Sequence, residues 1–254
     1  MAFADRSPII MQGKIFVQER DFNGAPLTGL DWVGNSDNAV LSFKQKRESV
    51  KDSYTGRGLT IVAPTVETEI EFMMSALDGR MTNYAMGFCG LWGGAEDAGS
   101  VSGESIVMYN GKYVQLAKTG VSNVTVSGAV LNTDYVVDSA PGGLLRVLSS
   151  STTIPEGTPL TTTASYDYAA NNGQVEGFVK SQKFYTIVVN GINVAQGNQP
   201  MVLRIHQVQL DATKKTDFID KKVQKFEMGG ELLLDTSIDP GDEEFSQMFT
   251  LRKG

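Results

Sequence analysis

The sequence is poor in the side chains that nucleophilic and acid–base catalysis use most. Its 254 residues include one cysteine, Cys89, and one histidine, His206. A single cysteine excludes an internal disulfide framework and fits a reducing cytoplasm. A Ser-His-Asp or Cys-His mechanism would have to use His206 as its base. No site converges on it from several segments, so we predict no catalytic residues and no enzyme.

Both residues have simpler interpretations. His206 sits in a strand-like run over residues 203–210, where a polar side chain would face solvent or a subunit contact. Cys89 follows Phe88 at the end of a helix-like segment, where it would pack as a small apolar residue. The two lack enough partners at ligand spacing to form a metal site, and we expect no metal and no cofactor.

Long apolar runs are also missing. No stretch approaches the roughly 20 residues that a membrane helix needs. The first residues show no basic segment followed by an apolar one, so we expect neither a signal peptide nor a membrane partner.

Positive charge is in deficit, with 22 Lys and Arg against 29 Asp and Glu and a net charge of −7. This balance argues against a protein that grips nucleic acid by its phosphates, although nucleic acid could still slide past such a surface. Gly56 to Gly58 forms a loop tip without the spacing of a phosphate-binding loop.

Two acidic clusters invite a calcium interpretation, one from Asp235 to Glu244 and one from Asp211 to Asp220. Neither has the ligand spacing of an EF-hand. We therefore expect solvated acidic segments, in particular an acidic tail after Asp235.

Short runs of alternating apolar and polar residues, separated by turn residues, dominate the chain and indicate a mainly β fold. Strands are predicted over residues 14–19, 38–50, 59–74, 106–109, 112–116, 121–130, 135–138, 142–148, 160–168, 184–190, 201–210 and 223–235. Pro64 implies a bulge, an edge or a strand start within the third of these. Residues 75–88 carry apolar side chains at helical spacing and predict one short α-helix.

The third strand carries a stripe of carboxylates, Glu67, Glu69 and Glu71, on one face. The other face holds Val66, Thr68, Ile70 and Phe72, of which we expect the three apolar ones to be buried. The stripe is either an ordinary solvated face or the wall of a lumen that repels passing DNA. Basic residues on other strands, namely Lys44, Lys46 and Arg204, could offset its charge.

The order of these motifs resembles that of bacteriophage tail tube proteins (major tail proteins). The C-terminal part has a strand, a Gly191-x-Asn193 turn, a second strand, and a final run from Gly230 to Asp235 that reads G-x-L-L-x-D. Earlier segments that share in the resemblance are the loop Lys51-Asp52-Ser53-x-Thr55-Gly56 and a middle pattern of Tyr135, Val137, Asp138, Gly143, Leu144, Ile154, Pro155, Gly157, Tyr166 and Tyr168.

The resemblance implies two packed antiparallel sheets, a sandwich or barrel-like tail tube fold, with a flanking helix and a loop that reaches a neighbouring ring. We assign that inter-ring loop to Lys51, Asp52, Ser53, Tyr54, Thr55, Gly56, Arg57 and Gly58. It further implies a virion structural protein, assembled in the host cytoplasm, whose hexameric rings stack into a conduit for DNA ejection. Its partners would be copies of itself, the other tail proteins (tape measure, terminator, distal tail or baseplate, and a sheath where the tail is contractile), and DNA that passes without sequence-specific binding.

This chain is longer than the smallest members of that family. We assign the tail tube core to residues 1–89 and 181–254 and a β-rich insertion within the same domain to residues 90–180, on the outer surface or at a subunit contact. The alternative is a stand-alone β-sandwich that serves as a decoration or host-adhesion module of a virion. A hexameric ring or tube would favour the first interpretation, and a compact monomer that binds a cell surface the second.

Overall fold

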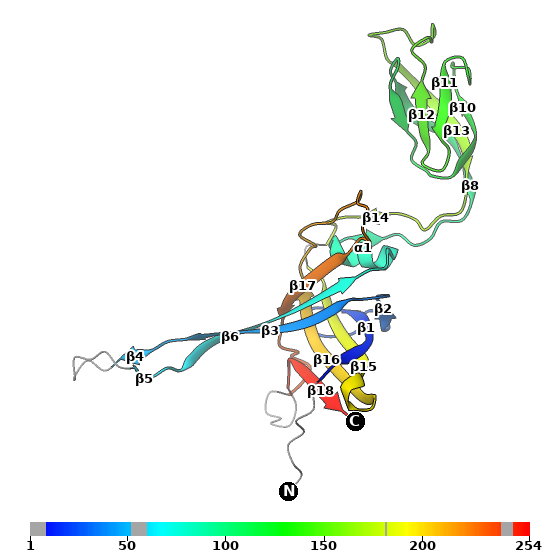
Figure 1. The fold of residues 1–254 in the computed structure, drawn as a ribbon. Coiled ribbons are helices and arrows are strands. Elements are labelled where there is room, and N and C mark those ends of the chain that lie inside the picture. Colours follow the sequence, from blue (N-terminus) through cyan, green and yellow to red (C-terminus); the bar gives the residue numbers. More distant parts are fainter. Residues whose placement is uncertain (1–8, 52–59, 181, 240–245) are drawn as a thin grey trace. The chain divides into compact units, whose positions relative to one another are not determined.

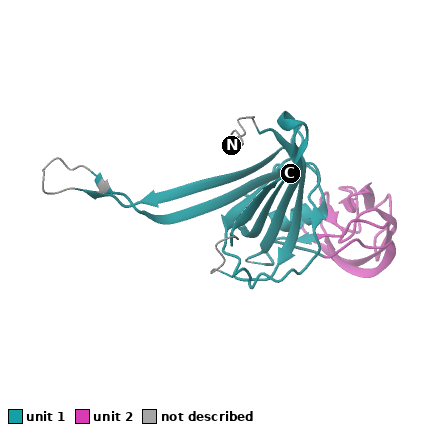
Figure 2. Cartoon of the chain, turned by 90° about the horizontal axis from the view of Figure 1, so that it is seen from below, with its two compact units in different colours: residues 1–92, 175–254 teal, residues 93–174 magenta. Residues whose placement is uncertain are grey.

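A computed structural model describes residues 9–51, 60–180, 182–239 and 246–254. The chain divides into two compact units, coloured separately in Figure 2: unit 1 is Met1–Trp92 with Val175–Gly254, and unit 2 is Gly93–Gln174. The chain leaves and re-enters unit 1 at one place, because β7 (Leu91–Trp92) pairs with β14 (Val175–Glu176). The insertion expected from the sequence has the wider limits 90–180.

Unit 1 is built on one antiparallel sheet of eight strands (Figure 1). The order is β2-β1-β15-β16-β17-β6-β3, and β18 also pairs with β16. The strands are β1 (Met11–Arg20), β2 (Asp31–Trp32), β3 (Asn38–Arg47), β6 (Thr65–Ala76), β15 (Phe184–Asn193), β16 (Gln199–Leu210), β17 (Phe226–Leu232) and β18 (Phe249–Lys253). A short ladder of β4 (Val50–Lys51) and β5 (Thr60–Val62) continues the β3–β6 hairpin.

The core of unit 1 joins side chains from both ends of this sheet. Phe72 and Met74 of β6 belong to the same buried cluster as Ile187 of β15, Ile205 of β16 and Ile15 of β1. The sheet must therefore curve around one core, and burying each such side chain contributes about 1.5–3 kcal/mol. Within the described residues no sheet closes into a barrel.

The helix is shorter than the sequence predicts. It is α1 (Met81–Gly87), whereas helical spacing extended over 75–88. Ser75 and Ala76 still belong to β6, and the Asp78 carboxylate accepts hydrogen bonds from the backbone and side chain of Asn35 at 3.0 and 3.2 Å. Asp78 is thereby held in a turn. The Tyr84 ring packs edge-on against Phe226 of β17 at 4.5 Å, which places α1 against the sheet.

The Gly191-x-Asn193 turn has a structural explanation. The Asn193 side chain is fully buried, and its Oδ1 accepts hydrogen bonds from the amides of Ile10 (3.0 Å) and Ala195 (3.3 Å), which starts the short 3-10 helix η1 (Val194–Gln196). A Cβ on Gly191 would lie 2.3 Å from the backbone oxygen of Gln12, so β1 can approach only a glycine there.

Unit 2 consists of two three-stranded antiparallel sheets that share a hydrophobic core, in the orders β10-β13-β8 and β11-β12-β9. Its strands are β8 (Gly99–Met108), β9 (Tyr113–Gln115), β10 (Val121–Val126), β11 (Tyr135–Ser139), β12 (Leu144–Val147) and β13 (Leu160–Tyr168). Tyr135, Leu145 and Met108 are almost completely buried and come from both sheets. The predicted fold class is confirmed for the whole chain: it is mainly β, with antiparallel sheets and one short helix.

Three expectations about strands need correction. The run over 59–74 is two strands, because Pro64 interrupts it and β6 starts at the next residue. Val66 was expected to be buried, but its side chain is 53% exposed, whereas Ile70 and Phe72 are buried. Val66 lies beyond the part of β6 that β17 covers. The final strand ends at Leu232, not at Asp235.

Candidate functional site

The three carboxylates of the predicted stripe lie on the outer face of β6, opposite the buried Ile70 and Phe72. The neighbouring strand β3 brings lysines to the same face. Lys44 Nζ is 2.5 Å from Glu71 Oε1, and Lys46 Nζ is 3.4 Å from Glu67 Oε2. The hydrogen bond to Glu71 raises the pKa of Lys44. The face is therefore a mixed charged surface, and two of its three carboxylates have a cation beside them.

On the N-terminal side of Glu71, where β6 has no partner but β3 among the described residues, the β3–β6 hairpin is a ribbon of only two strands. β17 pairs with β6 from Glu71 to Ala76, while residues 65–70 of β6 pair with β3 alone. In Figures 1 and 2 the hairpin extends away from the other strands of unit 1. We call residues 44–51 and 60–69 the ribbon.

Apolar side chains of the ribbon are open to solvent. Val50, Val62 and Val66 are 51%, 53% and 53% exposed. A two-stranded hairpin is marginally stable in water unless something covers it. Phe43, at the base of the ribbon, is 58% exposed, and its ring lies 5.9 Å from that of Phe249, which packs against the core of unit 1.

Of the loop assigned to an inter-ring contact, the structure describes one residue. Its first residue, Lys51, is exposed in β4, and residues Asp52 to Gly58 lie outside the described residues.

The two units differ in how their sheet edges are built. The outer edge of β3 is unpaired among the described residues, and its register with β6 runs without a shift from Asn38 to Lys46. In unit 2, both β10 and β8 have register shifts in mid-strand, beside Asn123 and Gly103, which have positive φ. Bulges protect edge strands from pairing with other chains, and a regular open edge invites such pairing.

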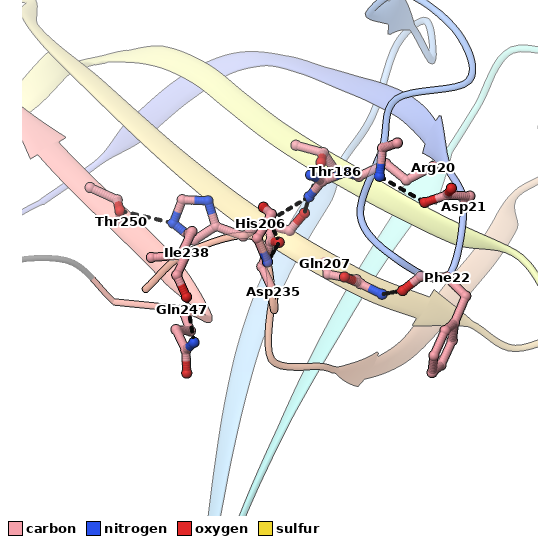
Figure 3. Close-up of polar contacts among 12 residues, drawn as sticks. Arg20, Asp21, Phe22, Thr186, His206, Gln207, Asp235, Ile238, Gln247 and Thr250 are labelled. Atoms are coloured by element: carbon pink, nitrogen blue, oxygen red, sulfur yellow. Dashed lines mark hydrogen bonds and ion pairs between the residues drawn. The ribbon is translucent and has the colours of Figure 1, made fainter. Parts of the chain in front are cut away.

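Asp235 lies in a buried polar cluster, so the expectation of a solvated acidic segment is wrong for this residue (Figure 3). Asp239 is exposed, and Asp242, Glu243 and Glu244 lie outside the described residues. Arg20 Nη1 donates to Asp235 Oδ2 at 2.6 Å and to the backbone oxygen of His206 at 2.7 Å. Ser237 donates its amide and hydroxyl to Asp235 Oδ1. Burial alone would raise the pKa of Asp235, but the hydrogen bonds from Ser237 and Arg20 outweigh it and hold that pKa below its usual value.

His206 belongs to the same cluster but has no catalytic arrangement around it. Its Nε2 lies 3.1 Å from Thr250 Oγ1 of β18, and its backbone oxygen also accepts a hydrogen bond from Thr186 (Figure 3). Burial, Arg204 and Arg20 lower the pKa of His206. Cys89 is buried after α1, which raises the pKa of its thiol. No contact in the described part of the chain joins Cys89 to His206.

The cluster therefore ties segments together. It connects the end of β1, the middle of β16, the segment after β17, and β18. The sequence shows Asp235 as the end of a motif and the start of an acidic cluster, but it does not reveal Arg20 as its partner, because 215 positions separate the two residues.

A search of curated proteins finds no match to this chain. A family model described as "Protein of unknown function UCP028589" matches residues 8–252. The chain belongs to this family. Because the match runs across residues 93–174, the UCP028589 family model spans unit 2 as well as unit 1.

Two features are absent from the described residues of this UCP028589 member. Among them, no group of three or more His, Cys, Asp or Glu side chains could hold a metal ion. None of the helices formed by these residues has the length and apolar character needed to cross a membrane.

Proposed function

We propose that this protein assembles with copies of itself into stacked rings that form a phage tail tube, a conduit for DNA ejection. The observation that supports this most is the ribbon, which extends from unit 1 with both faces exposed. Three exposed valines on a two-stranded hairpin gain stability only when another surface covers them. A neighbouring copy supplies that surface in a tube.

The open edge of β3 supports the same proposal. A regular edge of nine paired positions can accept a strand from a neighbouring copy, and a head-to-tail contact of this kind closes into a ring when the rotation allows. Rings of six are what the resemblance to tail tube proteins implies. The other tail proteins at the ends of the tube, and DNA passing through it, are then the further partners, and the activity needs no cofactor.

The stripe of Glu67, Glu69 and Glu71 stays a candidate lumen surface in this proposal. In that role the stripe would repel DNA less strongly than three uncompensated carboxylates, because Lys44 and Lys46 lie on the same face. We therefore rest the proposal on the ribbon and the open edge.

A second function is supported for unit 2 alone. It has its own core, its chain ends meet where β7 pairs with β14, and bulges interrupt both edge strands of its β10-β13-β8 sheet. These features suit a displayed module, such as a decoration or host-adhesion domain, that is carried by the assembly without taking part in its strand pairing.

Sedimentation velocity and negative-stain microscopy of the purified chain test the tube proposal. Wild-type protein should form rings or tubes as its concentration rises. Val66→Asp should stay folded and fail to assemble, because its side chain is already exposed in the single chain. The matched control is Val130→Asp in unit 2, where Val130 is 61% exposed, and it should assemble normally. A wild-type chain that stays monomeric at every concentration would refute the proposal.

A further inference from the structure

The outer face of the large sheet is divided by charge. At the β1-β15-β16-β18 end, Lys14, Asn190, Val202 and Arg252 form one row across four paired strands. Arg204 lies two residues along β16 from Val202, so it shares this face. The opposite face buries Ile15 and Val189. We call Lys14, Arg204 and Arg252 the basic half-face.

The basic half-face carries no compensating charge. The outward positions of these four strands hold no Asp or Glu. All three cations are exposed, and none forms an ion pair in the described part of the chain. Lys14 lies over the Trp32 ring, with its Nζ 4.9 Å from the centroid. Arg204 and Arg252 are diagonal neighbours, an arrangement of like charges that disfavours the single chain.

The other end of the same face is acidic. Glu71 of β6 is directly paired with Glu231 of β17, and Glu67 and Glu69 follow along β6. These four carboxylates and the two lysines Lys44 and Lys46 leave a formal charge of −2. Lys44 contacts Glu71 and Lys46 contacts Glu67, and neither Glu69 nor Glu231 has an ion-pair partner among the described side chains. We call these residues the acidic half-face.

We propose that the basic half-face of one copy docks on the acidic half-face of another. The charges, +3 and −2, are complementary, and the two surfaces are different parts of one molecule, so the contact is head-to-tail and repeats from copy to copy. The contact places cations beside Glu69 and Glu231, and it places carboxylates beside Arg204 and Arg252, which otherwise repel each other. It deepens the proposed function by naming charges that align neighbouring subunits, and it rests on that function.

Nucleic acid is the other polyanion that such a face could meet. A surface that grips phosphates is usually strongly basic, and its affinity grows with each phosphate neutralised. Three cations on a chain of net charge −7 are few for that purpose. A second copy, which offers an acidic surface of similar charge, fits them better.

Charge reversal tests the contact. Arg204→Glu with Arg252→Glu makes both half-faces acidic, and Glu69→Lys with Glu231→Lys makes both basic. Each double variant alone should need at least about tenfold more protein than wild type to assemble, as expected when close interfacial charge pairs are lost. Mixing the two variants should restore association, because acidic copies then alternate with basic ones. The measurement is sedimentation velocity in about 50 mM and about 500 mM NaCl, since salt screens the attraction.

Lys221→Glu with Lys222→Glu is the matched control. Both lysines are exposed and belong to neither half-face, and the variant changes net charge as much as Arg204→Glu with Arg252→Glu does. It should assemble like wild type, and circular dichroism should show all variants folded. The proposal is overturned if the reversed variants assemble like wild type. This holds even if the arginine variant binds DNA less tightly than wild type does. It is equally overturned if the mixed variants do not associate, whether or not wild type forms tubes.

Discussion

Breaking the Arg20–Asp235 pair should destabilise unit 1 severely. The two side chains are 10% and 4% exposed, and their charged atoms are 2.6 Å apart. Asp235→Asn keeps the shape of the side chain but leaves the Arg20 guanidinium buried without a counter-charge. Removing one partner of a buried pair costs about 3–5 kcal/mol. We expect the free energy of unfolding of unit 1 to fall by about 3 kcal/mol, near the lower limit, because Arg20 keeps its hydrogen bond to the His206 backbone oxygen.

Tryptophan fluorescence during urea unfolding measures this loss of stability in unit 1. The two tryptophans, Trp32 and Trp92, both belong to unit 1, so unfolding of unit 2 does not contribute a tryptophan signal. Glu67→Gln is the control, because it removes an exposed ion pair to Lys46 that contributes about 0–1 kcal/mol. Replacing both Arg20 and Asp235 with leucine should cost less than the sum of the single changes.

The same pair predicts how stability depends on pH. The folded-state pKa of Asp235 is lowered, so the unfolded chain binds this proton more readily than the folded chain does. The contribution of the carboxylate is therefore complete above the unfolded pKa of about 3.9 and disappears as pH falls through the lower folded pKa. The difference between wild type and Asp235→Asn should be constant near neutral pH and shrink in this acidic range. Additive losses from single Arg20 and Asp235 changes, or a difference that does not vary with acid pH, would refute the reasoning.

Four other predictions concern the hairpin, the core and unit 2. Deleting residues 51–58 should leave the β-type circular dichroism spectrum intact while tubes fail to form, and normal tubes would exclude the loop from the inter-ring contact. Replacing Glu67, Glu69 and Glu71 together with lysine should barely change the urea midpoint, since all three are outside the core; particles that carry the change should deliver DNA slowly, and normal delivery would remove the lumen assignment. Phe72→Ala should destabilise unit 1 by about 3–5 kcal/mol in the fluorescence assay, because the side chain is fully buried, and a loss below about 1 kcal/mol would contradict this packing. Replacing residues 93–174 with a short Gly-Ser linker should leave unit 1 folded by the same assay, because β7 and β14 already bring the two cut ends together.

The sequence by itself determined the fold class and much of the strand layout. Alternation is a local property, so the outward direction of Glu67, Glu69 and Glu71 and the burial of Ile70 and Phe72 could be read directly from residues 67–72. Pro64 likewise indicated a strand boundary at the start of β6, because proline lacks the backbone N–H that donates hydrogen bonds to a neighbouring strand. The sequence also showed the turn at Asn193 as a motif. It did not show why asparagine is needed there, which is that its side chain accepts hydrogen bonds from two backbone amides.

Only the tertiary structure decided which distant residues meet. Val66 and Ile70 share one face of β6, yet Val66 is exposed because it lies in the two-stranded ribbon, whereas Ile70 is next to the last residue that pairs with β17 and packs in the core of unit 1. Asp235 looked like the start of an acidic tail until Arg20, far away in the chain, was found beside it. The division of one sheet face into a basic and an acidic half also depends on strand order and register, which pair Val202 with Arg252 and Glu71 with Glu231. Such pairings depend on long-range packing, and no local pattern in the sequence encodes them.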